Sequence, residues 1–294
     1  MTAKTIAVDL VFVLDATQST QNVFSSMVDQ VNDLAIDLEI NYRKANIQYG
    51  AVIYRDPVDY HEIKSVPLDP ETRTEHDKLQ AQLKKERDLN LRKHDIDPEV
   101  LDREIAERES HFDREKFPFN KNVAIDVKND IDQLISELMK VECGSGNDEP
   151  EDWVGALKLA LDSIAWRENS KRGIVWISDA NAHGKLYCGY SNHDEEEPKM
   201  EPLVKRMAEE RIHFVGINVV RTYDRGCERT LNIMKELYHK YGGKSFLIEE
   251  FVPPKNDYLD DDDNEWPQDV MTQFIQTINK SLKRMGSLFD DFDV

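Results

Sequence analysis

Residues 6–14, with the sequence IAVDLVFVL, constrain the fold more than any other stretch, because Asp9 alone interrupts this apolar run. A run so short and so rich in β-branched residues is typical of a strand buried on both faces, and such strands occur mainly in parallel sheets. Residues 47–54 (IQYGAVIY) and 172–178 (RGIVWIS) repeat the pattern. The three runs predict a parallel sheet that is covered on both faces.

Apolar residues recur at three- and four-residue spacing between these runs, which is typical of amphipathic helices. We expect helices at 21–44, 124–141, 151–166, 198–210, 227–241 and 268–285, and further strands at 61–68, 212–220 and 245–248. Strands that alternate with helices in this way imply βαβ units. The predicted fold class is therefore α/β, with a Rossmann-like, doubly wound, mostly parallel sheet flanked by helices.

Residues 70–115 differ from the rest of the chain, because they are dense in charge of both signs and poor in apolar side chains. Their apolar spacing is helical, and Asp97-Pro98-Glu99 restarts a helix after a break. We therefore expect a charged helical hairpin inserted into a single α/β domain, which comprises residues 1–69 and 116–294.

The chain has 294 residues and carries 58 acidic against 38 basic side chains, which gives a formal charge of −20 at pH 7. Such a charge argues against binding to nucleic acid or to anionic membranes. No stretch approaches the roughly 20 apolar residues that a transmembrane helix needs. Three widely spaced cysteines, an odd number, argue against a disulfide framework and show no zinc-ligand spacing. We therefore expect a cytoplasmic protein.

Polar side chains follow two of the predicted central strands. Asp15, Thr17 and Ser19 come after the first strand, and Asp179 follows the strand at 172–178. Ligands of open parallel sheets bind beyond the carboxyl ends of the strands, where these side chains are expected to meet. Two carboxylates and two hydroxyls suit a hard cation such as Mg²⁺. The alternative is that these residues only cap helices and satisfy backbone donors.

The strand-end motifs resemble the von Willebrand factor A (vWA) domain with a metal-ion-dependent adhesion site (MIDAS). The resemblance rests on DLVFVLDATQS, VIYRDPVDY, ECGSGNDEPEDWVGALKLAL and WISDANAHG, which are similar to intracellular vWA domains associated with alpha-kinases. It extends over residues 6–285 apart from the insertion. The resemblance implies the vWA fold and a protein-interaction function that depends on a metal ion.

The resemblance also implies a set of ligands for Mg²⁺, or for Mn²⁺ or Ca²⁺ in its place. Asp15, Thr17 and Ser19 match the first-loop ligands, although Ser is commoner where Thr17 stands, and Asp179 matches a carboxylate that acts through water. The middle ligand comes from 147–152, where Asp148 is expected and Asn147 and Asp152 are alternatives. A third carboxylate would hold the cation more tightly but weaken its attraction for an acidic partner. His183 either reaches the rim of the site or is solvated.

Two functions remain open at this point. The first is an interaction module, not an enzyme, in which Mg²⁺ engages an Asp or Glu of a protein partner. The alternative is a metal-assisted phosphoester hydrolase that uses the acidic loop residues Asp148, Glu149, Glu151 and Asp152. Such an enzyme needs a general base and basic residues for the phosphate. Only Arg55 and Lys185 are candidates for that second role, and an alpha-kinase catalytic domain is not found in the sequence.

Overall fold

The computed structural model describes residues 6–17, 20–55, 122–128, 130–144, 149–191, 193–220 and 226–252, and single residues at 78, 81, 82, 84, 85, 273, 276, 277 and 280. The chain divides into two compact units, one made of residues 1–55 and 122–294 and the other of residues 56–121. The insertion expected at 70–115 falls within the second unit. Five residues of that unit are described, and all five are helical.

The first unit is built on a six-stranded sheet with the order β3-β2-β1-β4-β5-β6. Only β3 is antiparallel to its neighbour, β2, and the other pairs are parallel. The strands are β1 (Ile6–Asp15), β2 (Ala45–Tyr54), β3 (Val123–Lys128), β4 (Lys171–Ser178), β5 (His213–Val219) and β6 (Phe246–Phe251). The predicted α/β class and mostly parallel sheet are confirmed. Because the chain runs outward from β1 in both directions, the strand order reverses between β1 and β4, where ligands of such sheets bind.

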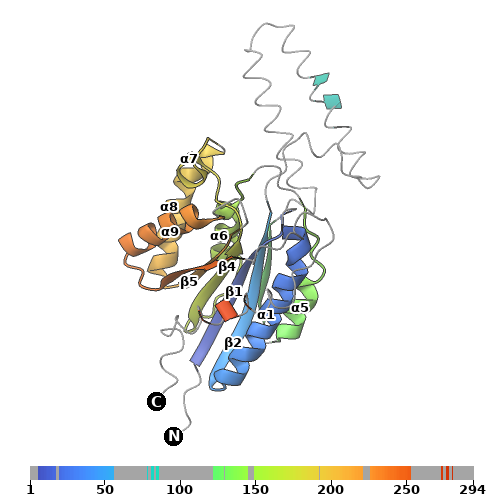
Figure 1. The fold of residues 1–294 in the computed structure, drawn as a ribbon, viewed down its shortest axis with the longest axis vertical. Helices are drawn as coiled ribbons and strands as arrows, with labels where there is room; N and C mark the ends of the chain where they lie inside the picture. Colours follow the sequence, from blue (N-terminus) through green and yellow to red (C-terminus); the bar gives the residue numbers. More distant parts are fainter. Residues whose placement is uncertain are drawn as a thin grey trace. The chain divides into compact units, whose positions relative to one another are not determined.

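Helices cover both faces of the sheet (Figure 1). One face carries α1 (Gln21–Asn41) and α5 (Ile131–Leu138), and the other carries α6 (Trp153–Asp162), α8 (Glu197–Glu209) and α9 (Glu228–Lys240). Successive β1 residues enter opposite cores, with Phe12 and Leu14 on the α1 face and Val11 and Val13 on the α6 face. Because β1 is covered on both of its faces, nearly all of its side chains are apolar.

The helix predicted at 124–141 is wrong in its first half. Residues 123–128 form β3, whose alternating residues VAIDVK suit an edge strand beside β2. The helix begins only after Asp130, whose side chain accepts a hydrogen bond from the Asp132 N–H and so caps α5. The strand expected at 61–68 and most of the helix expected at 268–285 lie outside the described residues.

The segment between β4 and α8 also contains regular structure. A short helix, α7 (Lys185–Cys188), and a 3-10 turn (Asp194–Glu196) follow β4 before α8 begins. The left-handed backbone at Gly184 and Gly189 lets the chain enter and leave α7 sharply.

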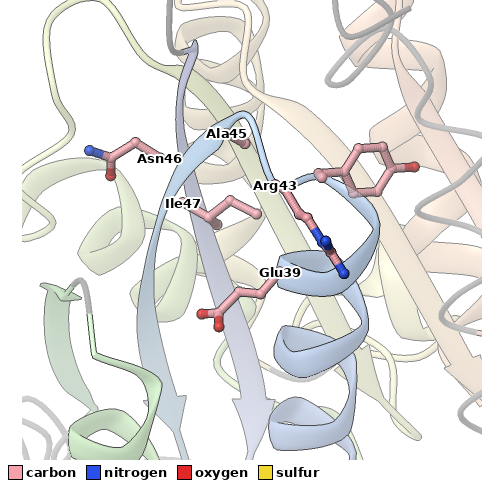
Figure 2. A pocket seen from close by; sticks show the side chains of 6 residues that line it. Glu39, Arg43, Ala45, Asn46 and Ile47 are labelled. Carbon is pink, nitrogen blue, oxygen red and sulfur yellow. The ribbon is translucent and has the colours of Figure 1, made fainter.

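Polar contacts also occur at the opposite end of the sheet, where β1 and β2 begin. The buried Asp9 carboxylate accepts hydrogen bonds of 2.6 Å from Arg167 Nε and from Ser170 Oγ. Arg167 also donates to Asn46 at the start of β2. A hollow of about 580 Å³ lies beside Asn46, and its lining includes Glu39 of α1 and Arg43 in the turn between α1 and β2 (Figure 2).

Candidate metal centre at the carboxyl edge of the sheet

Asp15 is the last residue of β1, and its carboxylate is fully buried. Oδ1 accepts hydrogen bonds from the Thr17 N–H at 3.0 Å and the Thr17 hydroxyl at 2.7 Å. Oδ2 accepts from the Tyr54 hydroxyl at 3.2 Å and the Ser178 hydroxyl at 3.4 Å. The carboxylate is therefore held from two sides, by its own loop and by both neighbouring strands.

Asp179 is brought beside Asp15 by the register of the sheet. Leu14 pairs with Ile177, so that Ser178 and Asp179 continue β4 alongside the end of β1. Asp179 is only 7% exposed. Burial raises the pKa of Asp15 to about 7, and the charge of Asp179 contributes to this rise, while the hydrogen bonds from Thr17 and Tyr54 oppose it. Two such carboxylates are unfavourable unless a proton or a cation compensates their charge.

Helix capping does not account for Asp15. The N-cap residue of α1 is Thr20, and no side chain makes a cap hydrogen bond there. The Thr20 hydroxyl instead donates to the backbone carbonyls of Asp15 and Thr17, at 3.0 Å each, and so fixes the turn between β1 and α1. Thr17 donates its proton to the Asp15 carboxylate, and a hydroxyl oxygen in that arrangement has lone pairs that can ligate a cation.

The segment before α6 joins the segment after β4. The Glu151 N–H donates to the Asn181 carbonyl at 2.8 Å, and the His183 N–H donates to the Glu151 carbonyl at 3.3 Å. Burial raises the pKa of the Tyr54 hydroxyl well above its ordinary value, and the charges of Asp15 and Glu151 raise it further. The buried Glu151 side chain therefore lies near the hydroxyl that contacts Asp15.

The two alternative ligands among the described residues make other contacts. Asp152 caps α6, because Oδ1 accepts from the Gly155 N–H at 2.6 Å and Oδ2 accepts from Asn122 Nδ2 at 2.7 Å. His183 is buried, so the solvated interpretation is wrong, and its Nδ1 lies 3.0 Å from Glu196 Oε2. Ser19, Asn147 and Asp148 lie outside the described residues, and their predicted roles stay predictions.

The donor atoms gathered here suit a hard cation. Asp15, Thr17 and Asp179 offer carboxylate and hydroxyl oxygens, which are the ligands that Mg²⁺ prefers, and Mg²⁺ is commonly held by only one or two carboxylates. Within the part of the chain that the structure describes, no three His, Cys, Asp or Glu side chains are grouped so that they could hold a metal ion. A cation at this position would thus depend also on hydroxyls, on waters and on ligands from outside the described residues.

Sequence reasoning missed Tyr54, Ser178 and Asn122. Tyr54 ends β2, and it reaches Asp15 because the two residues are partners in the β1–β2 register. Ser178 stands next to Asp179 in the sequence, but only the β1–β4 pairing places it against Asp15. A known strand order would have identified both residues.

Comparison with known proteins agrees with the topology. Residues 2–99 match the family model described as the TssR protein VWA domain. This match covers β1 with its Asp-x-Thr-x-Ser loop, α1 and β2, and the remaining described strands complete a mostly parallel six-stranded sheet. Residues 2–99 thus resemble a vWA domain. No described helix is long and apolar enough to span a membrane.

One curated protein is similar to this chain in sequence. Alpha-protein kinase vwkA of Dictyostelium discoideum is 36% identical over 55 residues, which is 19% of this chain and 9% of that protein. The similarity therefore concerns a small part of the kinase.

Solved structures that resemble this chain have low sequence identity to it. The SpRpn10 VWA domain has a TM-score of 0.45 at 9% identity, covering 92% of this chain and 95% of its own. BatB from Bacteroides thetaiotaomicron has a TM-score of 0.43 at 12% identity, covering 94% and 99%. Proximal thread matrix protein 1 from the mussel byssus, described with a zinc-occupied MIDAS motif, has a TM-score of 0.43 at 11% identity, covering 93% and 46%.

Proposed function

We propose that this vWA-like domain is a protein-interaction module in which a divalent cation engages an Asp or Glu of a partner protein. Asp15, Thr17 and Asp179 would hold the cation, with Ser19 and a residue of the 147–152 loop, foremost Asp148. Mg²⁺ is the expected ion, with Mn²⁺ or Ca²⁺ as substitutes. The observation that supports this function best is the pair of neighbouring buried carboxylates, Asp15 and Asp179.

A cation explains that pair better than any other compensating group. A proton can relieve the repulsion only below about pH 7, where Asp15 becomes neutral. A bound divalent cation relieves it at every higher pH. Because hydroxyl ligands add no negative charge, such a cation keeps a positive field toward solvent. A chain with a net charge of −20 could in this way still attract an acidic partner.

The interaction function is favoured over the phosphoester hydrolase by the position of Arg55. This side chain is only 5% exposed, and its Nη2 donates to the Glu142 backbone carbonyl at 2.7 Å. One of the two basic residues that such a hydrolase would need is therefore engaged in holding a loop. The cytoplasmic location expected from the sequence stays a prediction.

Titration calorimetry with Mg²⁺ and Mn²⁺ tests the proposed cation. The wild type is compared with Asp15→Asn, which keeps the shape of the side chain, and with Asp162→Asn as a matched control. Asp162 is an exposed carboxylate at the end of α6 that pairs with Lys158 Nζ at 2.9 Å. We expect the wild type and the control to bind one ion with equal affinity and Asp15→Asn to give no binding heat. Equal binding heats from all three proteins would contradict the proposal.

Affinity capture with the same three proteins tests the partner. We expect a protein that is retained in Mg²⁺, released by EDTA and not retained by Asp15→Asn. Amidation of the partner's carboxylates should abolish its retention. Retention that is unchanged by EDTA would show that the interaction does not use the cation.

A further inference from the structure

The two residues that flank the 56–121 unit, Arg55 and Asn122, are joined to each other, and we call this pair the stem. The Arg55 N–H donates to Asn122 Oδ1 at 2.9 Å. Both residues belong to the unit that contains the sheet. The stem is therefore a fixed point at the carboxyl end of β2, next to the candidate metal centre.

Each stem residue also holds one end of the loop at 143–152, which supplies the expected middle ligand. Arg55 Nη2 donates to the carbonyl of Glu142, directly before the loop, at 2.7 Å. Asn122 Nδ2 donates to Asp152 Oδ2, at the end of the loop, at 2.7 Å. The residues that border the insertion thus fix the loop at both of its ends.

The fit between Asn122 and Asp152 is close. A Cβ atom added to Gly155 would lie 2.1 Å from Asp152 Oδ2 and 2.7 Å from Asn122 Nδ2. Any side chain at position 155 would therefore push these groups apart. The glycine permits Asp152 to cap α6 and to bind Asn122 at the same time.

The loop held in this way lies against the Asp15 turn. The Gly144 N–H donates to the Ala16 carbonyl at 3.0 Å, directly after Asp15. At the other end of the loop, Glu151 pairs with the segment that follows Asp179. A shift of either end would disturb the contacts of Gly144 and Glu151 with the residues that follow Asp15 and Asp179.

We propose that Arg55 and Asn122 are positioning residues that hold the two ends of segment 143–152 beside the residues that follow Asp15 and Asp179. The stem thereby joins the carboxyl end of β2 to both ends of this segment. The consequence for metal binding rests on the proposed function, whereas the positioning of the loop does not.

Two substitutions at Asn122 test the two hydrogen bonds of its side chain, one with the Arg55 N–H and one with Asp152. Asn122→Ala removes both of them. Asn122→Asp keeps an oxygen that can accept from the Arg55 N–H, but it places a carboxylate against Asp152, so that this contact becomes repulsive. Asn46→Ala is the matched control, because Asn46 Oδ1 accepts from Arg167 Nη1 at 3.1 Å at the opposite edge of the sheet.

Hydrogen–deuterium exchange of the metal-free full chain and Mn²⁺ affinity are the two measurements. We expect both Asn122 variants to speed exchange in peptides from 143–152, and Asn46→Ala to leave these peptides unchanged. Mn²⁺ affinity should fall roughly three- to tenfold in both Asn122 variants, a factor that corresponds to one buried hydrogen bond.

The outcomes distinguish the two proposals. Unchanged exchange at 143–152 in both Asn122 variants overturns the positioning role, whatever the metal affinity does. Faster exchange without any Mn²⁺ binding by the wild type supports the positioning role and overturns the proposed function. Equal effects of Asn46→Ala and Asn122→Ala on the loop would show a general loss of stability and would also overturn the inference.

Discussion

The hydroxyl of Tyr54 donates a hydrogen bond of 3.2 Å to Oδ2 of Asp15, its register partner on the adjacent strand. This bond stabilises the charged form of the Asp15 carboxyl and opposes the rise of its pKa. The orientation of a candidate metal ligand thus depends on a residue 39 positions away in the sequence.

Tyr54→Phe should weaken metal binding without removing the binding site. Loss of the hydroxyl removes one donor to Asp15, so that the pKa of this carboxyl rises and a proton competes more strongly with the cation. We expect Mg²⁺ affinity at pH 7 to fall about threefold to tenfold, as for one hydrogen bond to a charged group. Calorimetry at pH 7 and pH 8.5 measures the effect, which should be smaller at the higher pH. An effect equal at both pH values would contradict this mechanism.

Asp15→Asn should stabilise the metal-free protein. The substitution removes one of two neighbouring buried charges and keeps the side-chain volume, so the free energy of unfolding should rise by on the order of 1 kcal/mol. Thermal unfolding in EDTA at pH 7.5 tests this expectation. Asp162→Asn is the control for loss of an exposed carboxylate, and because Asp162 pairs with Lys158 and Arg206 we expect it not to be stabilised. Added Mg²⁺ should stabilise the wild type and the control but not Asp15→Asn. A metal-free Asp15→Asn protein that is less stable than the wild type would argue against unfavourable repulsion at this site.

The stability of the metal-free protein should depend on pH through Asp15. Its pKa is about 7 in the folded protein and near 3.8 when unfolded, so the folded state binds more protons between these values. Protonated Asp15 contributes fully to the free energy of unfolding below about pH 4, and this contribution is lost as the pH rises through 7. When the pH rises from 5.5 to 7.5, the free energy of unfolding of the wild type should fall by about 2 kcal/mol more than that of Asp15→Asn. Denaturant unfolding in EDTA measures the difference, and parallel pH profiles of the two proteins would refute it.

Gly155→Ala should destabilise the domain, although alanine normally favours a helix over glycine by about 1 kcal/mol. The added methyl would collide with Asp152 and Asn122, at 2.1 and 2.7 Å. We expect the free energy of unfolding to fall by about 1–3 kcal/mol because the cap and the contact with Asn122 are both disturbed. Gly144→Ala is the control, since an added Cβ there would meet no atom within 4 Å. Urea unfolding of both variants measures the change in the free energy of unfolding. A Gly155→Ala protein that is more stable than the wild type would contradict the structure.

Asp9→Ala should destabilise the protein without changing its metal affinity. Asp9 is buried and holds Arg167 and Ser170 at the edge of the sheet opposite to Asp15. Removal of one partner from such a pair costs about 3 kcal/mol. Urea unfolding and Mn²⁺ titration at a temperature where the variant is folded test both expectations. A loss of Mn²⁺ affinity comparable to that of Asp15→Asn would show that the metal centre responds to general instability.

The strands of the sheet could largely be predicted from the sequence. Most residues of 6–14, 47–54 and 172–178 are buried in β1, β2 and β4, and burial on both faces favours apolar side chains along the whole strand. The buried Asp9 is an exception, and its carboxylate is paired with Arg167. The edge strand β3 was mistaken for a helix, because its six residues are only partly buried and its pattern merges with that of α5. An isolated short segment carries too little periodicity to decide between the two.

The sequence by itself determined the alternation of strands and helices and the polar side chains that follow β1 and β4, since both are local properties of the chain. The tertiary structure decided which groups meet. Tyr54 and Ser178 reach Asp15 through strand order and register, and Asn122 reaches Asp152 through the packing of two segments that are distant in the chain. The physical reason is that a hydrogen bond or a charge acts over a few ångströms of space, whatever the separation along the chain.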